Sequence, residues 1–117
     1  MASTPLVTVV IPAFNAARHI GEALTSVEQQ TLADFEVIVV DDGSTDGTLD
    51  EVQRFRGAFP LTVIPQKNGG VSAARNAAIR RAAGRYCAFL DADDVMLPDR
   101  LRSQVTLLES DAGMGLV

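Results

Sequence analysis

The sequence is poor in features that mark several classes of protein. Cys87 is the only cysteine, so no intrachain disulfide can form. Because this cysteine lies within an apolar run, we expect a buried thiol rather than a nucleophile. The longest apolar runs, such as residues 6–13, are too short to cross a bilayer, and no signal segment is evident. We therefore expect a cytoplasmic protein, placed at the cytoplasmic face of the membrane if a full-length form carries membrane helices.

Basic residues are also scarce. The chain has 10 Lys and Arg against 15 Asp and Glu, which gives a formal net charge of -5. This balance argues against nucleic acid as a partner, because binding to a phosphate backbone normally needs clustered Lys and Arg. An anionic ligand must then be attracted by something other than net charge. The 117 residues, 47% of them hydrophobic, fit a single soluble domain with one modest core.

Short β-branched runs alternate with helix-length amphipathic segments along the whole chain, which is typical of βαβ units and a parallel sheet. The fold class is therefore α/β. Strands are expected at residues 7–11, 35–40, 61–64 and 86–90, the third stopping at Pro65, with another beginning at 113–117.

Four helices are expected between and after these strands. The positions that indicate where they begin and end are Asn15 as a cap, Gly69 and Gly70 before a helix, Gly84 after it, and Pro98 at a first helical position. The residues expected on the inner faces are Ile20, Leu24, Val27, Val52, Val71, Ala74, Ala78, Ala82, Leu101, Val105 and Leu108.

Three polar loops follow predicted strands, at residues 13–16, 41–47 and 91–94. Ligands of an open parallel sheet bind outside the carboxyl ends of its strands. If the first strand lies between the second and the fourth, these loops line one crevice. We therefore expect the ligand site at this edge.

Two carboxylates, Asp91 and Asp93, follow the last apolar strand. If they are about 5 Å apart, two such charges repel by roughly 3 kcal/mol at an effective dielectric of about 20. A divalent cation removes that cost, and oxygen ligands favour Mg²⁺ or Mn²⁺, which also binds substrate phosphates. The alternative is that residues 91–94 only form a turn and cap a helix, a role that suits Asp94 as well as a ligand role does.

Asp41 and Asp42 close another strand at the same edge, where a carboxylate can accept hydrogen bonds from a nucleobase or a ribose. The alternative is an Asx-turn with a helix cap, for which Thr45 and Asp46 are suited. The glycine pair at 69–70 with Arg75 could cradle a phosphate. His19 is expected on a solvated helix face, with no role in binding a ligand.

Together these segments resemble family 2 glycosyltransferases, inverting enzymes of the GT-A fold. The resemblance is carried by VVIPAFN at 9–15, FEVIVVDDGSTDGT at 35–48, NGGVSAARN at 68–76 and FLDADD at 89–94, which follow the family's order over nearly the whole chain. It implies a Rossmann-like three-layer α/β/α fold, a nucleotide-sugar donor that is most often a UDP-sugar, and a divalent cation, Mn²⁺ or Mg²⁺.

The resemblance also implies roles for single residues. Pro12 and Phe14 would line the base pocket, and Asp41 and Asp42 would bind uracil or ribose. Asp93 would ligate the metal, while Asp91 would contact ribose or metal and Arg75 would lie near the diphosphate or sugar.

Family members are considerably longer than this chain. The resemblance therefore implies that residues 1–117 form one domain, the donor-binding half, with the acceptor site and the general base lying beyond Val117. We expect little transfer by this half alone to an acceptor, which could be a glycan, a lipid carrier or a protein. An uncovered sheet edge or apolar face would favour a homodimer.

Two other functions remain open from the sequence. The chain could be a nucleotide-binding or interaction module without catalysis. Haloacid dehalogenase phosphatases also place an Asp-x-Asp after an apolar strand, but that motif normally opens their domain, whereas here it comes last and no lysine follows it.

Overall fold

The structure is a computed structural model that describes residues 4–110. Its four strands, β1 (Val7–Ala13), β2 (Phe35–Asp42), β3 (Leu61–Gln66) and β4 (Tyr86–Phe89), form one parallel sheet in the order β3-β2-β1-β4. The first strand therefore lies between the second and the fourth, as the predicted crevice requires. The strand expected at 113–117 lies outside the described residues.

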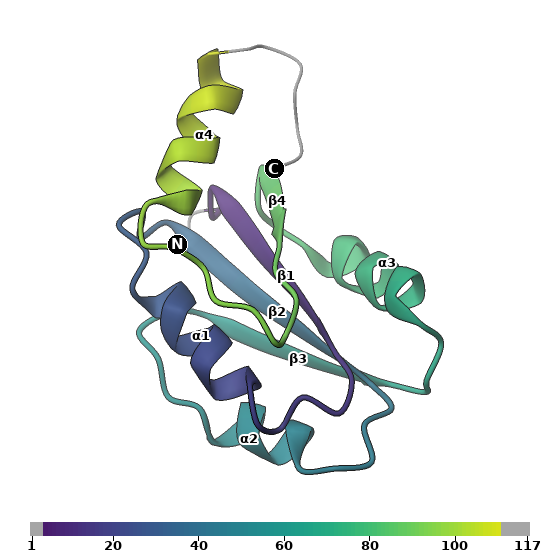
Figure 1. Ribbon diagram of the computed structural model, residues 1–117. Helices are drawn as coiled ribbons and strands as arrows, with labels where there is room; N and C mark the ends of the chain where they lie inside the picture. Colours follow the sequence, from purple (N-terminus) through teal and green to yellow (C-terminus); the bar gives the residue numbers. More distant parts are fainter. Residues whose placement is uncertain (1–3, 111–117) are drawn as a thin grey trace.

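The helices α1 (Ile20–Glu28), α2 (Thr48–Arg54), α3 (Val71–Arg81) and α4 (Arg100–Ser110) cover both faces of the sheet. Buried residues of α1, α2 and α4 share one hydrophobic cluster with one face of β1 and β2, and α3 packs on the other face (Figure 1). The three-layer α/β/α arrangement and the parallel sheet are thus confirmed. No helix within residues 4–110 is long and apolar enough to cross a bilayer.

Burial follows the sequence pattern closely in the middle of the sheet. β1 and β2 are buried along almost their whole length, as expected of central parallel strands covered on both faces. On the α3 side, Ala74 and Ala78 lie against Val10, Ile38 and Val40. Their small side chains let the helix approach the sheet closely.

Two prolines act differently from the prediction. β3 continues through Pro65 to Gln66, which is possible because β3 is an outer strand of the sheet, where a missing N–H is tolerated. Pro98 is not the first residue of α4, which begins at Arg100. Instead, Pro98 lies in the preceding turn, and its carbonyl accepts a hydrogen bond from the Thr31 N–H at 2.9 Å.

The prediction that Gly84 ends a helix is also wrong. α3 ends at Arg81, its C-cap is Ala82 in an extended conformation, and only Gly43 and Gly70 among the described glycines have positive φ. A Cβ at position 84 would lie 2.5 Å from the backbone nitrogen of Thr8. Gly84 is therefore required because β1 passes too close for any side chain.

Candidate functional site

The loops after β1 and β2 are joined through Asn15. Its backbone N–H donates to Ser44 Oγ at 2.9 Å, and its side-chain Oδ1 accepts from the Thr45 N–H at 2.8 Å. Asn15 has a φ of 50°, a left-handed conformation that Asn tolerates better than most residues. The prediction that Asn15 caps α1 is wrong, because α1 begins at Ile20 and the amide serves the neighbouring loop.

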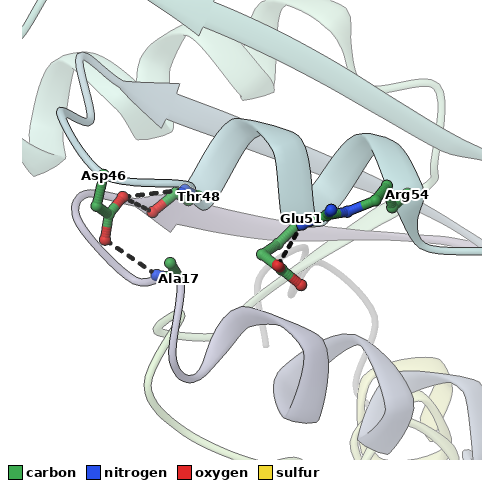
Figure 2. A network of polar contacts seen from close by, with 5 residues as sticks. All are labelled: Ala17, Asp46, Thr48, Glu51 and Arg54. Atoms are coloured by element: carbon green, nitrogen blue, oxygen red, sulfur yellow. Dashed lines mark hydrogen bonds and ion pairs between the residues drawn. The ribbon is translucent and has the colours of Figure 1, made fainter.

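Asp46 ties the same two loops together at the start of α2. Its carboxylate accepts hydrogen bonds from the N–H and hydroxyl of Thr48 and from the Ala17 N–H, as Figure 2 shows. The Thr48 hydroxyl is the main cause of a lowered pKa at Asp46. Asp46 therefore accepts from the first N–H of α2, although the N-cap residue itself is Gly47, and Thr45 contacts Asn15 instead of capping the helix.

Asp42 is buried at the end of β2, with 4% of its surface exposed. Its Oδ1 accepts from Gln66 Nε2 and from the Gly69 N–H, both at 2.8 Å, and its Oδ2 accepts from the Gly70 N–H at 2.9 Å. Burial raises the pKa of this carboxyl, but the three hydrogen bonds outweigh burial and bring the pKa below its ordinary value of 3.8. Asp42 is therefore a carboxylate that organises the β3–α3 loop.

A small cavity of about 90 Å³ opens beside Asp42. It is lined by Pro12, Ala13, Phe14, Asp42, Val71 and Ala74. Three residues predicted for the base pocket, Pro12, Phe14 and Asp42, are thus brought together. Val71 was expected in the core, but it is 51% exposed and lines this cavity at the start of α3.

Asp41 does not line this cavity. It is buried, and its Oδ1 accepts a hydrogen bond from the Ser44 N–H at 3.3 Å, which makes the Asx-type turn that the sequence offered as the alternative. The predicted contact of Asp41 with a nucleotide therefore stays a prediction.

The three carboxylates after β4 converge. Asp91, Asp93 and Asp94 are exposed, and each offers a carboxylate oxygen within 4.8 Å of the others. The Asp94 N–H also donates to the Asp91 carbonyl at 3.0 Å, so the segment forms a turn as well. Exposed carboxylate oxygens at this separation suit a hard divalent cation that keeps several waters, so the residues present fit Mg²⁺ or Mn²⁺.

Arg75 reaches the same group from α3. Its Nη2 lies 4.0 Å from Asp91 Oδ1, and its guanidinium carbon lies 5.4 Å from the centre of the Phe89 ring. Its Nε is buried and has no hydrogen-bond partner among the described residues. The structure thus brings the predicted Arg75 and Asp91 together and leaves one donor of the guanidinium unused.

A second cavity, of about 280 Å³, joins the β1 loop to the carboxylates. Its lining residues are Pro12, Phe14, Asn15, Ala16, His19, Asp91, Ala92 and Asp93. Pro12 and Phe14 line both cavities, so the two are adjacent. His19 is exposed, as the sequence predicted, but it lines the cavity together with Asp91 and Asp93, although the sequence indicated no role for it in binding a ligand. The sequence signal that could have pointed to His19 was its position directly before Ile20, the first inward residue of α1.

The irregular segment after the carboxylates is held by the end of α1. The Ser26 hydroxyl accepts from the Met96 N–H at 2.9 Å, and the buried Gln30 amide donates to the Leu97 carbonyl at 2.6 Å. Gln30 Oε1 accepts from the Leu101 N–H at 3.0 Å. These contacts, which no sequence motif indicated, fix the path of the chain between β4 and α4.

Comparison with known proteins identifies this arrangement. Residues 8–114 match the profile of the family described as "Glycosyl transferase family 2". The chain belongs to this family. This assignment confirms the family resemblance and sets aside the haloacid dehalogenase alternative.

Similar proteins include two curated relatives. TuaG of Bacillus subtilis (strain 168), named as a teichuronic acid biosynthesis glycosyltransferase, is 42% identical over 106 residues, covering 89% of this chain and 42% of TuaG. Chondroitin synthase of Pasteurella multocida (strain Pm70) is 42% identical over 96 residues, covering 81% of this chain and 10% of that enzyme. The chain thus spans less than half of either relative.

Solved structures give the same picture of the fold. S. aureus TarS in complex with UDP-GlcNAc has a TM-score of 0.83 and 34% identity, covering 90% of this chain and 31% of TarS. The mannosyltransferase PcManGT from Pyrobaculum calidifontis, in complex with GDP-Man and Mn²⁺, has a TM-score of 0.74 and 35% identity, covering 80% of this chain and 29% of that enzyme. These matches support the predicted Rossmann-like, GT-A type fold.

Proposed function

We propose that this chain is the donor-binding half of an inverting, metal-dependent glycosyltransferase that takes a sugar from a UDP-sugar. The observation that carries the proposal is the pair of adjacent cavities, one beside the buried Asp42 and one beside the exposed Asp91 and Asp93. A nucleoside diphosphate matches these two cavities, because its aromatic base and its anionic diphosphate lie on opposite sides of the ribose.

The smaller cavity suits the base. Its walls are the apolar Pro12, Phe14 and Val71, and its acceptor is the Asp42 carboxylate. Asp42 Oδ2 accepts one hydrogen bond within the protein, so it retains lone-pair capacity for a base N–H. Apolar walls beside a carboxylate acceptor suit the flat ring and the ring N–H of a base such as uracil. The structures of TarS in complex with UDP and with UDP-GlcNAc support the same choice.

The larger cavity suits the diphosphate. Asp93, with Asp91 beside it, would hold Mn²⁺ or Mg²⁺, and the cation would supply Lewis-acid stabilisation of the departing nucleoside diphosphate. The guanidinium of Arg75, close to Asp91 and partly exposed, would attract the diphosphate or the sugar through its positive charge. Asp42, Pro12 and Phe14 would hold the base end of the nucleotide.

The proposed acceptor is a hydroxyl group, carried by a glycan, a lipid carrier or a protein. We propose that its pocket and the general base are supplied by residues that the longer relatives contain, and that residues 1–117 transfer sugar poorly by themselves. The name of the relative TuaG, a teichuronic acid biosynthesis glycosyltransferase, favours a role in cell-wall or polysaccharide biosynthesis. We also propose that the protein works on the cytoplasmic side of the membrane. A homodimer through the outer strand β4 or an exposed apolar face is part of this proposal.

Isothermal titration of the chain with uridine, UDP and GDP, with and without Mn²⁺, tests the donor site. We expect UDP to bind more tightly than GDP, and Mn²⁺ to strengthen UDP binding at least about tenfold, as for a charge-neutralising contact. Asp93→Ala should remove that metal-dependent gain while leaving uridine binding unchanged. Asp50→Ala, a change in a carboxylate of α2, is the matched control and should behave as wild type.

Two results would change the conclusion. Absence of binding by all three nucleotides, with or without metal, would favour the alternative of an interaction module. Tighter binding of GDP than UDP would move the proposed donor to a GDP-sugar, the class named with PcManGT.

A further inference from the structure

We propose that His19 donates a hydrogen bond to a phosphoryl oxygen of the donor diphosphate. This inference rests on the proposed function and adds a contact on the wall of the larger cavity. His19 is the N-cap residue of α1, and it lines the cavity of about 280 Å³ together with Asp91 and Asp93.

The chemistry of the cavity wall calls for such a group. The ionised carboxylates of Asp91 and Asp93 accept hydrogen bonds but donate none. They therefore cannot bind a phosphoryl oxygen without a cation between the two groups. Pro12, Phe14, Ala16 and Ala92 offer no polar side chain. Two lining residues, Asn15 and His19, have side-chain N–H donors.

Of these two residues, Asn15 is already held by the protein through its amide oxygen, although its Nδ2 donors have no partner among residues 4–110. Its amide oxygen accepts from the Thr45 N–H and hydroxyl, which fixes the side chain against the β2–α2 loop. The imidazole of His19 takes part in no hydrogen bond or ion pair found within residues 4–110, and the residue is exposed. His19 is therefore a donor that a ligand can recruit without breaking an existing contact, and its side chain, unlike that of Asn15, is held by no hydrogen bond found among the described residues.

The backbone holds His19 at this place. Its N–H donates to the Ala16 carbonyl at 2.9 Å, and its own carbonyl accepts from the Ala23 N–H at 3.1 Å. The buried Ala16 and Ile20 flank it, so the turn before α1 is anchored on both sides. Such anchoring lowers the entropy that the imidazole contact loses on binding.

A phosphoryl contact fits better than a metal ligand. The carboxylate cluster that converges within 4.8 Å consists of Asp91, Asp93 and Asp94 and does not include His19. A cation at these carboxylates and an imidazole elsewhere on the cavity wall would instead contact the diphosphate from two sides. The sequence neighbour Arg18 is also exposed but does not line the cavity, which makes it a matched control.

The test is isothermal titration of uridine and UDP in the presence of Mn²⁺ with wild type, His19→Ala, His19→Gln and Arg18→Ala. We expect His19→Ala to weaken UDP binding about tenfold, as for loss of a hydrogen bond to a charged group, and to leave uridine binding unchanged. His19→Gln keeps an N–H donor and should recover most of the loss. Arg18→Ala should match wild type for both ligands.

Equal UDP affinity in wild type and His19→Ala, with both binding normally, would overturn this inference and leave the proposed function standing. A parallel loss of uridine affinity in His19→Ala would also overturn it, because the change would then act on the base pocket. Failure of the wild type to bind either ligand would overturn the proposed function and this inference together.

Discussion

The side-chain amide of Gln30 donates to the carbonyl of Leu97 at 2.6 Å, across 67 positions of sequence. This hydrogen bond joins the segment just after α1 to the irregular segment that follows the carboxylates. Gln30 is 7% exposed, and its amide oxygen is also used, by the Leu101 N–H. One buried side chain therefore satisfies backbone groups on both sides of the turn into α4.

Gln30→Ala should lower the free energy of unfolding by about 1–3 kcal/mol, because buried backbone groups would lose their partners. The metal-dependent part of UDP binding should also fall, since Asp93 precedes the released segment, while uridine binding should change little. Urea denaturation and titration measure the two effects. Gln29→Ala, at the exposed neighbouring position, is the control. Unchanged stability in Gln30→Ala would contradict the role given to this amide.

Asp42→Asn should also destabilise the fold. Asparagine has a single side-chain oxygen, so it cannot accept from both the Gly69 and Gly70 N–H groups as the two carboxylate oxygens do. We expect a cost of about 1.5–3 kcal/mol, as for the loss of a hydrogen bond to a charged group. The measurement is chemical denaturation at pH 7. Glu51→Gln, in an exposed ion pair of α2 seen in Figure 2, should cost much less and serves as the control.

The stabilisation by Asp42 should depend on pH in one direction. Its pKa is lowered in the folded protein, so the carboxylate stabilises the fold fully above its ordinary pKa of 3.8, and this contribution is lost as pH falls through the lower folded value. The difference in unfolding free energy between wild type and Asp42→Asn should therefore be constant from pH 7 to about pH 5 and shrink in more acidic solution. A difference that grows on acidification would show that folding does not lower the pKa of Asp42.

Gly84→Ala should be strongly destabilising. Its new Cβ would lie 2.5 Å from Thr8 N and 2.6 Å from Thr8 Oγ1, and β1 cannot move without disturbing the central sheet. We expect a loss of about 2 kcal/mol or more. Gly21→Ala is the matched control, because a Cβ at position 21 would meet nothing within 4 Å and alanine favours the helix. A thermal unfolding temperature that is equal in both variants would contradict the close approach.

The thiol of Cys87 should react slowly with iodoacetamide at pH 7. Burial is the main cause of its raised pKa, and the nearby Glu36 carboxylate raises it further, so little thiolate is present. The residue is half-buried rather than fully buried as expected. Alkylation followed by mass spectrometry should be much faster in urea than in buffer. Equal rates in the two conditions would contradict the protection by the fold.

The sequence predicted the parts of this molecule that depend on local pattern. Apolar runs indicated β1 and β2 correctly because central parallel strands are buried on both faces. Because the polar loops follow the carboxyl ends of parallel strands, the pattern also placed Asp42 and Asp91 at one edge of the sheet, where the candidate site lies.

The errors arise where contacts between distant segments decide. Asn15 looked like a helix cap, but its amide is used by Thr45 in another loop. Gly84 looked like helix punctuation, but the reason for glycine lies in the approach of Thr8. Local sequence cannot reveal which of two roles a polar or small residue takes when the deciding partner is far along the chain.

The central position of β1 has a consequence for the order of assembly. β1 pairs with β2, which follows it closely in the sequence, but also with β4, which is made much later. During synthesis, β1, β2 and β3 can pair first, and the pocket around Pro12 and Asp42 can form before β4 exists. The carboxylates that follow β4 are then the last part of the candidate site to reach their place, so the cavity beside Asp42 can form in the growing chain before the carboxylate cluster does.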